Sequence, residues 1–195
     1  MQKFHHAVNS SLPISLAKSR AAAPAAWRAA SRTQSLVRAG VFTALTVLLT
    51  YVFAVQTPFV RFSFGFLPLA LYGALAGPWR AALVAAAADL IGVSLFGTGA
   101  FFPGFTLSAL LVGAIYGVSF HGRPLTVWRV ALTFLFVDTA VHLVLNTLWL
   151  YLLYGKGVAA LLASRVPKIV LCYPLRVAMF LIVSRPLLQF AAGRR

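Results

Sequence analysis

The chain has 195 residues, of which 61% are hydrophobic, and its mean hydropathy is +0.90. Only 10% of the residues are charged, with 17 Lys or Arg against two carboxylates. A soluble domain of this size has about a quarter of its residues charged, with both signs mixed on its surface. The composition therefore excludes a water-soluble globular fold and indicates an all-α membrane protein, with room for about six crossings of ~20 residues each.

Charge and cysteine content exclude further classes. The net charge of +15 is spread between hydrophobic runs and forms no basic face with interleaved aromatic side chains, so no nucleic-acid partner is expected. Cys172 is the single cysteine, which excludes a disulfide within the chain and a metal site built from several cysteines.

Residues 1–35 differ from the rest of the chain because they are rich in Ala, Ser and Arg and contain no acidic residue. They lack the apolar segment of a secretory signal, so two interpretations stay open. One is an organellar transit peptide. The other, which we favour, is a disordered basic extension on the cytosolic side that touches anionic lipid headgroups. We expect a membrane domain over 36–190 and a basic tail over 191–195.

Six mostly uncharged runs predict membrane helices. In chain order they are expected over residues 36–56, 65–77, 80–95, 106–120, 128–154 and 165–190. The second is short because Gly77 and Pro78 end it, whereas the sixth continues despite Pro174 and Pro186. The Gly- and Phe-rich segment 96–105 is expected to be a loop. Six crossings place both termini on the same side of the membrane.

The positive charges give this six-helix bundle an orientation. With both termini cytosolic, twelve of the 17 cations lie inside, as the positive-inside rule requires. Arg61, Lys156, Arg165 and Lys168 lie outside, against that rule, and Arg176 falls within the sixth helix. The simplest explanation for the four outer cations is an anionic ligand that arrives from outside. Arg165 and Lys168 are three residues apart, so they share a face suited to carboxylates.

The fifth helix carries a polar stripe at the spacing of one helical face, made of Asp138, His142, Asn146 and Trp149. A rise of ~1.5 Å per residue puts Asp138 about 15 Å deep, where a charge needs a partner. Arg176 reaches a similar depth, which predicts an Asp138–Arg176 ion pair, although Asp89 competes for the same arginine. The alternative, that the two acids are only structural clamps between helices, stays open.

Aromatic and amide groups near the outer surface suit a flat heteroaromatic ligand. Asn146 offers a donor and an acceptor, and Trp149, one turn away, offers an aromatic face. Phe101, Phe102 and Phe105 in the outer loop add apolar cover, or else anchor that loop in the membrane interface.

No catalytic motif is present. The chain has no Walker-type phosphate loop, no His-Glu-x-x-His, no Gly-x-Ser-x-Gly and no close pair of carboxylates. We therefore expect no ATP-driven or metallohydrolase activity, no metal site and no bound cofactor in this chain, whereas Ser or His chemistry is not excluded by the absence of a motif and stays open. Small residues at a spacing of four, Gly40 with Ala44 and Ala109 with Gly113 and Gly117, allow close helix contact. By themselves they indicate packing within the bundle more often than a partner protein.

Several motifs in succession resemble one family. They are Arg61-Phe-Ser-Phe-Gly-Phe-Leu-Pro68, Ala88-Asp-Leu-Ile-Gly92, Thr98-Gly-Ala-Phe-Phe-Pro-Gly-Phe-Thr106, Asn146-Thr-Leu-Trp149, Tyr154-Gly-Lys156 and Arg165-x-x-Lys168. Together, over roughly residues 36–190, they closely resemble the folate-specific S components of energy-coupling factor (ECF) transporters. The resemblance implies a six-helix, non-enzymatic subunit of the bacterial plasma membrane. Such a subunit captures folate outside and releases it inside after docking on a T component and two ATPases, which hydrolyse the ATP.

The resemblance also implies a binding set for folate or reduced folates. Carried over residue by residue, it comprises Arg61, Phe64, Phe101, Phe102, Asn146, Trp149, Arg165 and Lys168. The pterin ring is expected against Asn146 and Trp149, and the glutamate, with its two carboxylates, nearer the basic mouth. Gly40 and Ala44 match the small-residue contact with the T component, with Gly40 where the family has Ala.

One departure and several alternatives accompany the resemblance. Where the family pattern suggests a Gln after Pro174, this chain has Leu175 and Arg176, and Asp138 is interpreted as the compensation. An S component for another compound, such as a queuosine precursor or pantothenate, remains an alternative. From a different class, the chain would be a small membrane enzyme or a helper subunit, neither of which needs the outer cations or the Asn146–Trp149 pair.

Overall fold

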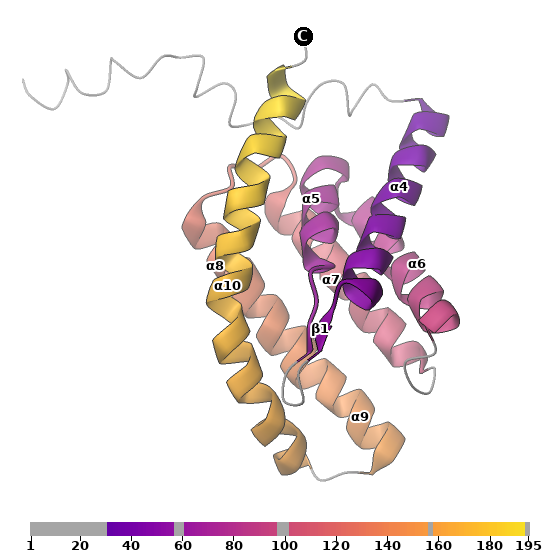
Figure 1. Ribbon diagram of the computed structural model, residues 1–195, viewed down its shortest axis with the longest axis vertical. Coiled ribbons are helices and arrows are strands. Elements are labelled where there is room, and N and C mark those ends of the chain that lie inside the picture. The colour runs from indigo at the N-terminus through magenta and orange to yellow at the C-terminus, as the bar shows by residue number, and fades with distance from the viewer. Residues whose placement is uncertain (1–30, 57–60, 97–101, 156–157, 194–195) are drawn as a thin grey trace, which may run out of the picture.

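The computed structural model describes residues 31–56, 61–96, 102–155 and 158–193 (Figure 1). The elements are α4 (Arg32–Val47), the π-helical η1 (Leu48–Val52), β1 (Val55–Gln56), β2 (Arg61–Phe62), α5 (Phe66–Ala76), α6 (Pro78–Phe96), α7 (Pro103–Phe120), α8 (Val127–Phe136), the π-helical η2 (Val137–Leu145), α9 (Asn146–Tyr154) and α10 (Val158–Gly193). The helical fold class is confirmed, and the strands are one two-residue antiparallel ladder.

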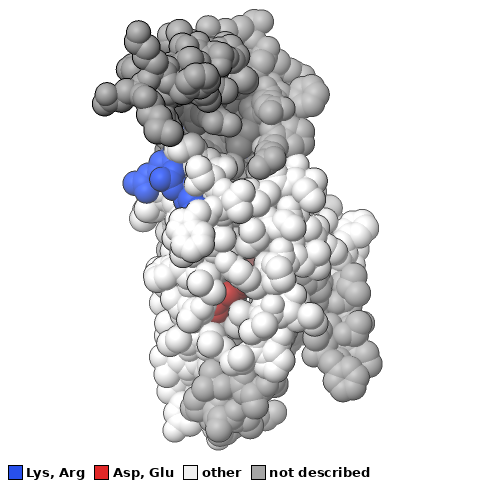
Figure 2. All heavy atoms as spheres, turned by 90° about the vertical axis from the view of Figure 1, so that its left-hand side faces the viewer, with Lys and Arg blue, Asp and Glu red and all other residues white. Residues whose placement is uncertain are grey.

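Four helical stretches of the described part are long and apolar enough to cross a membrane. They are Arg32–Val52, Pro78–Phe96, Pro103–Phe120 and Val127–Leu153. Two shorter apolar stretches, Phe66–Ala76 and Ile169–Ser184, accompany them. Figure 1 shows that the beginning of α4 and the end of α10 lie at the same end of the molecule. Figure 2 shows a face that is largely uncharged, with one basic patch towards that end.

The first helix differs from its predicted range, 36–56, at both ends. It begins at Arg32, where the Ser31 hydroxyl caps it by accepting a hydrogen bond from the Gln34 N–H at 3.3 Å. It ends at Val52, and Val55–Gln56 pair with Arg61–Phe62 as antiparallel strands. The prediction of helix to residue 56 was wrong because the apolar run continues past the point where the backbone becomes extended.

Glycines bound α5 as predicted. Gly77 follows its last residue with a φ of 92°, a backbone conformation in which a side chain is strained, and Pro78 then begins α6. A Cβ on Gly65, before the first turn, would overlap the Thr50 hydroxyl. This glycine therefore lets α5 approach η1 closely.

The segment expected as a loop, 96–105, is partly helical. Helix α6 extends to Phe96, and α7 begins at Pro103 rather than at 106. The prediction was wrong here because Pro103 occupies the first turn, where its fixed φ favours the helix and its missing N–H costs no hydrogen bond. Phe102 precedes it with an extended backbone, and its carbonyl accepts from the Phe105 N–H at 3.0 Å.

Helices α6 and α7 pack closely through the small residues of α7. A Cβ on Gly113 would overlap the backbone of Ala81, and one on Gly117 that of Pro78. By contrast, Gly40 and Ala44 of α4 are exposed, and a Cβ on Gly40 would meet nothing within 4 Å. The α7 series thus serves packing within the bundle, whereas the α4 pair faces outward.

The helices from 127 onward are longer or less regular than predicted. Elements α8, η2 and α9 follow one another without a break over Val127–Tyr154, and the middle part is π-helical. Gly155, with a φ of 62°, ends α9. Helix α10 covers Val158–Gly193, beyond the predicted 165–190 at both ends, and contains Pro174 and Pro186.

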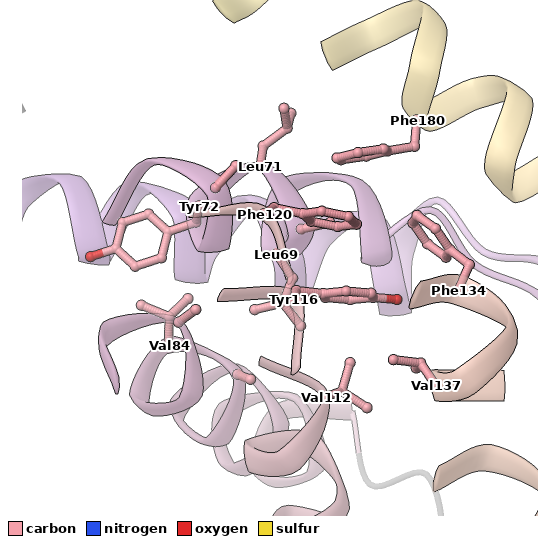
Figure 3. Packing of buried hydrophobic residues seen from close by; sticks show 14 of the residues in the cluster. Leu69, Leu71, Tyr72, Val84, Val112, Tyr116, Phe120, Phe134, Val137 and Phe180 are labelled. Carbon is pink, nitrogen blue, oxygen red and sulfur yellow. The ribbon is translucent and has the colours of Figure 1, made fainter. Parts of the chain in front are cut away.

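Aromatic side chains form the centre of the core (Figure 3). The Phe120 ring of α7 stacks on Tyr116 at 5.9 Å and on Phe180 of α10 at 5.2 Å between centroids. Phe134 of α8 lies 5.5 Å from Phe180. These contacts hold α7, α8 and α10 together.

Candidate functional site

A cavity of about 190 Å³, open on one side, lies among the helices. Its wall is formed by residues of α4, η1, α5, α6, α7, η2 and α10 and of the segment before α5. The residues with polar side chains in the wall are Thr46, Thr50, Tyr51, Ser63, Asp89, Tyr116, His142 and Arg176. An otherwise apolar pocket with a few polar groups can hold and orient an organic ligand.

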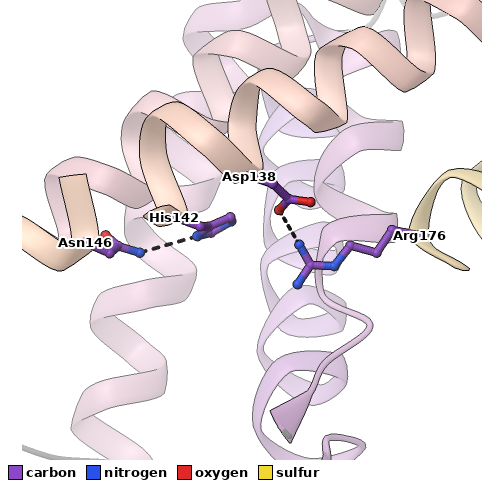
Figure 4. Close-up of polar contacts among 4 residues, drawn as sticks. All are labelled: Asp138, His142, Asn146 and Arg176. Atoms are coloured by element: carbon purple, nitrogen blue, oxygen red, sulfur yellow. Dashed lines mark hydrogen bonds and ion pairs between the residues drawn. The ribbon is translucent and has the colours of Figure 1, made fainter. Parts of the chain in front are cut away.

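Arg176 extends from α10 towards η2 and pairs with Asp138 (Figure 4). Its Nη1 lies 2.5 Å from Asp138 Oδ1. The carboxylate side chain is 1% exposed and the arginine side chain 18% exposed. The guanidinium carbon also lies 5.7 Å from the centre of the Phe66 ring, a cation–π contact. Arg176 lines the cavity, and Asp138 holds it there.

Two atoms of this pair keep unused hydrogen-bonding capacity. Asp138 Oδ2 and Arg176 Nε are buried and have no hydrogen-bond partner among the described residues. Native structures pair most buried polar groups with protein, water or ligand. The pair is therefore held firmly at one contact and is incompletely satisfied at its other atoms.

Asp89, the other acid considered as a partner for Arg176, is hydrogen-bonded to Thr106 instead. Its Oδ2 accepts a hydrogen bond from the Thr106 hydroxyl at 2.8 Å, which links α6 to the first turn of α7. Asp89 is half-buried and lines the cavity. The wall thus contains a carboxylate from α6 and a guanidinium from α10.

Asn146 is connected to the cavity through His142. Its Nδ2 lies 3.3 Å from His142 Nδ1, and His142 lines the cavity. Figure 4 shows Asp138, His142 and Asn146 following one another along the same helical stretch. Asn146 Oδ1 is buried without a hydrogen-bond partner in the part of the chain that the structure describes.

Trp149 belongs to an aromatic cluster with Phe102 and Phe105. Its ring lies 5.7 Å from that of Phe102, which lies 6.1 Å from that of Phe105. Its indole N–H donates to Ser108 Oγ at 3.0 Å. A Cβ on Gly104 would come within 2.6 Å of the indole, so a glycine is needed there. The cluster contacts α7 and is not part of the cavity wall described above.

For most of the remaining predicted binding residues, the structure describes at most the backbone. Phe64 lies half-buried between β2 and α5, and its N–H donates to the Leu49 carbonyl at 3.1 Å. Arg61 belongs to β2, and Arg165 and Lys168 belong to α10, but their side chains lie outside the described ones. Phe101 lies outside the described residues.

Sequence reasoning missed the contribution of the first helix to the cavity. Thr46, Thr50 and Tyr51 line the cavity, and none was predicted as a site residue. A signal was present, because Thr43, Thr46 and Thr50 stand at helical spacing in an otherwise apolar run. His142 was part of the predicted stripe but had no assigned role. Ser63 carried no such signal.

Comparisons with known proteins agree with one another. The chain matches the family described as ECF transporter, substrate-specific component, over residues 34–190. It is 40% identical over 131 residues to the folate transporter FolT of Clostridium novyi, covering 67% of this chain and 76% of that protein. It is 29% identical over 153 residues to the FolT of Leuconostoc mesenteroides, covering 75% and 82%.

A solved structure adds a match in three dimensions. A crystal structure of FolT bound with folic acid is 37% identical, with a TM-score of 0.74, and the match covers 79% of this chain and 94% of that one. The family match over residues 34–190 includes the residues that line the cavity. The chain therefore belongs to the family of substrate-specific components of ECF transporters, which are transport subunits and not enzymes.

Proposed function

We propose that this chain is the folate-binding subunit of an ATP-driven ECF importer in the bacterial plasma membrane. The observation that carries the proposal is the likeness to FolT bound with folic acid, at 37% identity and a TM-score of 0.74. Relatives from two bacteria also carry the name folate transporter. The wall of the cavity between the helices combines apolar and polar side chains, as sites for organic ligands do.

In this proposal, folate or a reduced folate binds with its ring system towards the cavity and its glutamate towards the outer mouth. Asn146 and His142 offer hydrogen-bonding groups, and Trp149, Phe64, Phe101 and Phe102 offer aromatic surface. Arg61, Arg165 and Lys168 supply positive charge for the two carboxylates. The hydrogen-bonded contact between Asn146 and the cavity residue His142 supports the placement of the ring.

The proposed topology has six crossings with both termini in the cytosol. Residues 1–35 form the cytosolic extension, 36–190 the membrane domain and 191–195 the basic tail. The common location of the beginning of α4 and the end of α10 supports an even number of crossings (Figure 1). The excess of cations on the inner segments supports the orientation.

The proposed partners are a T component and two ATPases, which contact this chain through the α4 face that carries Gly40 and Ala44. Both residues are exposed, and the space above Gly40 is open. Small residues on an exposed helix face allow another helix to approach closely. ATP is hydrolysed by the partner subunits, and this chain needs no cofactor of its own.

Uptake of labelled folic acid into bacteria that lack their own folate uptake tests the proposal. Cells that express this chain with the T component and ATPases should accumulate folic acid, and cells that express the chain alone should not. Uptake of pantothenate or of a queuosine precursor in place of folic acid would leave the assignment to the transporter family intact and contradict folate as the ligand. Full uptake by the chain alone would overturn its dependence on the module.

A further inference from the structure

We propose that Arg176 determines ligand specificity by donating hydrogen bonds from the cavity wall to a neutral acceptor on the ligand's ring. Asp138 acts as its positioning residue. This inference rests on the proposed function and deepens it, because it assigns a ligand-binding role to a pair that would otherwise be a clamp between helices.

Arg176 lies in the cavity wall, where a bound ligand can reach it. Among the described residues that line the cavity, it is the one cation, and Asp89 is the one anion. Its guanidinium is fixed on one side by Asp138 and on another by the Phe66 ring. A planar guanidinium held at two contacts presents its remaining N–H groups in a defined direction. The side chain is 18% exposed, so the cavity reaches it.

Arg176 keeps N–H donors that its contact with Asp138 does not use. A guanidinium has five N–H groups, and one contact, from Nη1 to Asp138 Oδ1, accounts for the hydrogen bonding of Arg176 to the described side chains. Nε is buried and has no partner in the described part of the chain. An arginine that served only as a clamp would leave this donor unpaired at a cost in stability. A ligand acceptor in the cavity would use the donors that Asp138 leaves free on the exposed part of the side chain.

The local charge decides which ligand group binds there. Asp138 already neutralises Arg176, and Asp89 adds a second carboxylate to the surroundings of the cavity. A ligand carboxylate at this place would lose its hydration, compete with Asp138 for the guanidinium and face Asp89. A ring carbonyl accepts the same hydrogen bonds without a net charge. The 4-oxo group of a pterin is such an acceptor, whereas the glutamate carboxylates are not.

The other groups in the wall are compatible with this assignment. Tyr116 of α7 and His142 of η2 line the cavity together with Arg176, and both side chains offer hydrogen-bonding groups to a ring. Ser63 and Thr50 add hydroxyl groups to the wall. Apart from Asp89, the polar groups that share the wall with the neutralised arginine are hydroxyl and imidazole groups, which suits an uncharged heteroaromatic ring.

Calorimetric titration of detergent-purified full-length protein tests the inference with three ligands. Folic acid carries the 4-oxo acceptor, aminopterin replaces it with a 4-amino donor, and pteroic acid keeps the oxo group but lacks the glutamate. The variant is Arg176→Gln, and Arg80→Gln is the matched control because it removes one exposed cation at the start of α6, away from the cavity wall.

We expect the wild-type protein to prefer folic acid over aminopterin. Arg176→Gln should lower the affinity for folic acid and for pteroic acid by the same factor, roughly 10- to 100-fold, since a hydrogen bond to a charged group is lost. It should also shrink the preference for folic acid over aminopterin, while Arg80→Gln changes neither. A merely structural role would lower all three affinities together and leave the preference intact, which would overturn the inference.

A second variant separates a loss of ligand binding from a loss of folding. Arg176→Gln alone leaves Asp138 without its partner, whereas the double variant Arg176→Gln/Asp138→Asn removes both buried charges. The double variant should also lose the preference for folic acid over aminopterin. If pteroic acid kept its affinity in either variant while folic acid lost it, Arg176 would bind the glutamate, and the inference would be overturned. If the wild-type protein bound none of the three ligands, the proposed function would fail as well.

Discussion

Trp149 of α9 donates its indole N–H to the hydroxyl of Ser108 in α7 at 3.0 Å, and its ring packs on Phe102, which directly precedes α7. One side chain thus joins the last part of the 127–154 helix to α7 and to the residue before it. In a membrane protein such an interhelical hydrogen bond also fixes the ring plane. The orientation of the proposed aromatic surface for the ligand therefore depends on Ser108.

Replacing Trp149 by Phe should weaken folic acid binding about fivefold or more, because the hydrogen bond to Ser108 and part of the aromatic face are lost together. Ser108→Ala should have a smaller effect in the same direction, since the ring remains. Titration of both variants with folic acid measures the two losses. Equal affinity of Trp149→Phe and wild type would contradict the role given to the indole.

Gly113→Ala should lower the thermal unfolding temperature in detergent, because its Cβ would overlap the backbone of Ala81 and push α6 and α7 apart. Overpacking of this kind costs about 1–3 kcal/mol. Gly40→Ala is the matched control, since its Cβ meets nothing within 4 Å and alanine favours the helix. If both variants were destabilised alike, the close α6–α7 packing would be in question.

Gly40→Phe should abolish folic acid uptake in cells that contain the T component and ATPases, and leave folic acid binding by the purified chain unchanged. The large ring would occupy the open space on α4 that the proposed partner helix needs. Gly40→Ala should retain both activities. Normal uptake by Gly40→Phe would place the docking surface elsewhere.

Asp138→Asn should destabilise the protein by about 3–5 kcal/mol, since Arg176 would keep a buried charge without its partner. The double variant with Arg176→Gln should be less destabilised than the two single effects added together. Unfolding curves of the four proteins in one detergent give the coupling. Additive losses would show that the contact between the two side chains contributes nothing of its own.

Much of the fold follows from hydropathy and from glycine and proline positions. The ends of α5 were predictable because Gly77 adopts a backbone conformation that other residues avoid, and Pro78 begins the next helix. The end of the first helix was not predictable, since the uncharged run continues past Val55 and Gln56, which pair with Phe62 and Arg61 as extended strands.

The candidate site was predictable in part. The depth argument joined Asp138 to Arg176, and the two side chains are hydrogen-bonded in the structure. It left Asp89 as a competitor for Arg176, because Thr106, which donates to Asp89, was expected at a loop boundary instead of within the first turn of α7. The spacing of Thr46 and Thr50 marks a polar face on the first helix, but whether that face lines the cavity depends on how α4 and η1 pack against α5, which the spacing does not reveal.

In the proposed function, this chain binds folate on its own. Calorimetric titration of the detergent-purified protein with folic acid measures this binding, with pantothenate and a queuosine precursor titrated in parallel. We expect saturable binding of one folic acid per chain well below micromolar concentration, and no binding of the other two compounds. Absence of folic acid binding at micromolar ligand, from protein that unfolds cooperatively, would contradict it.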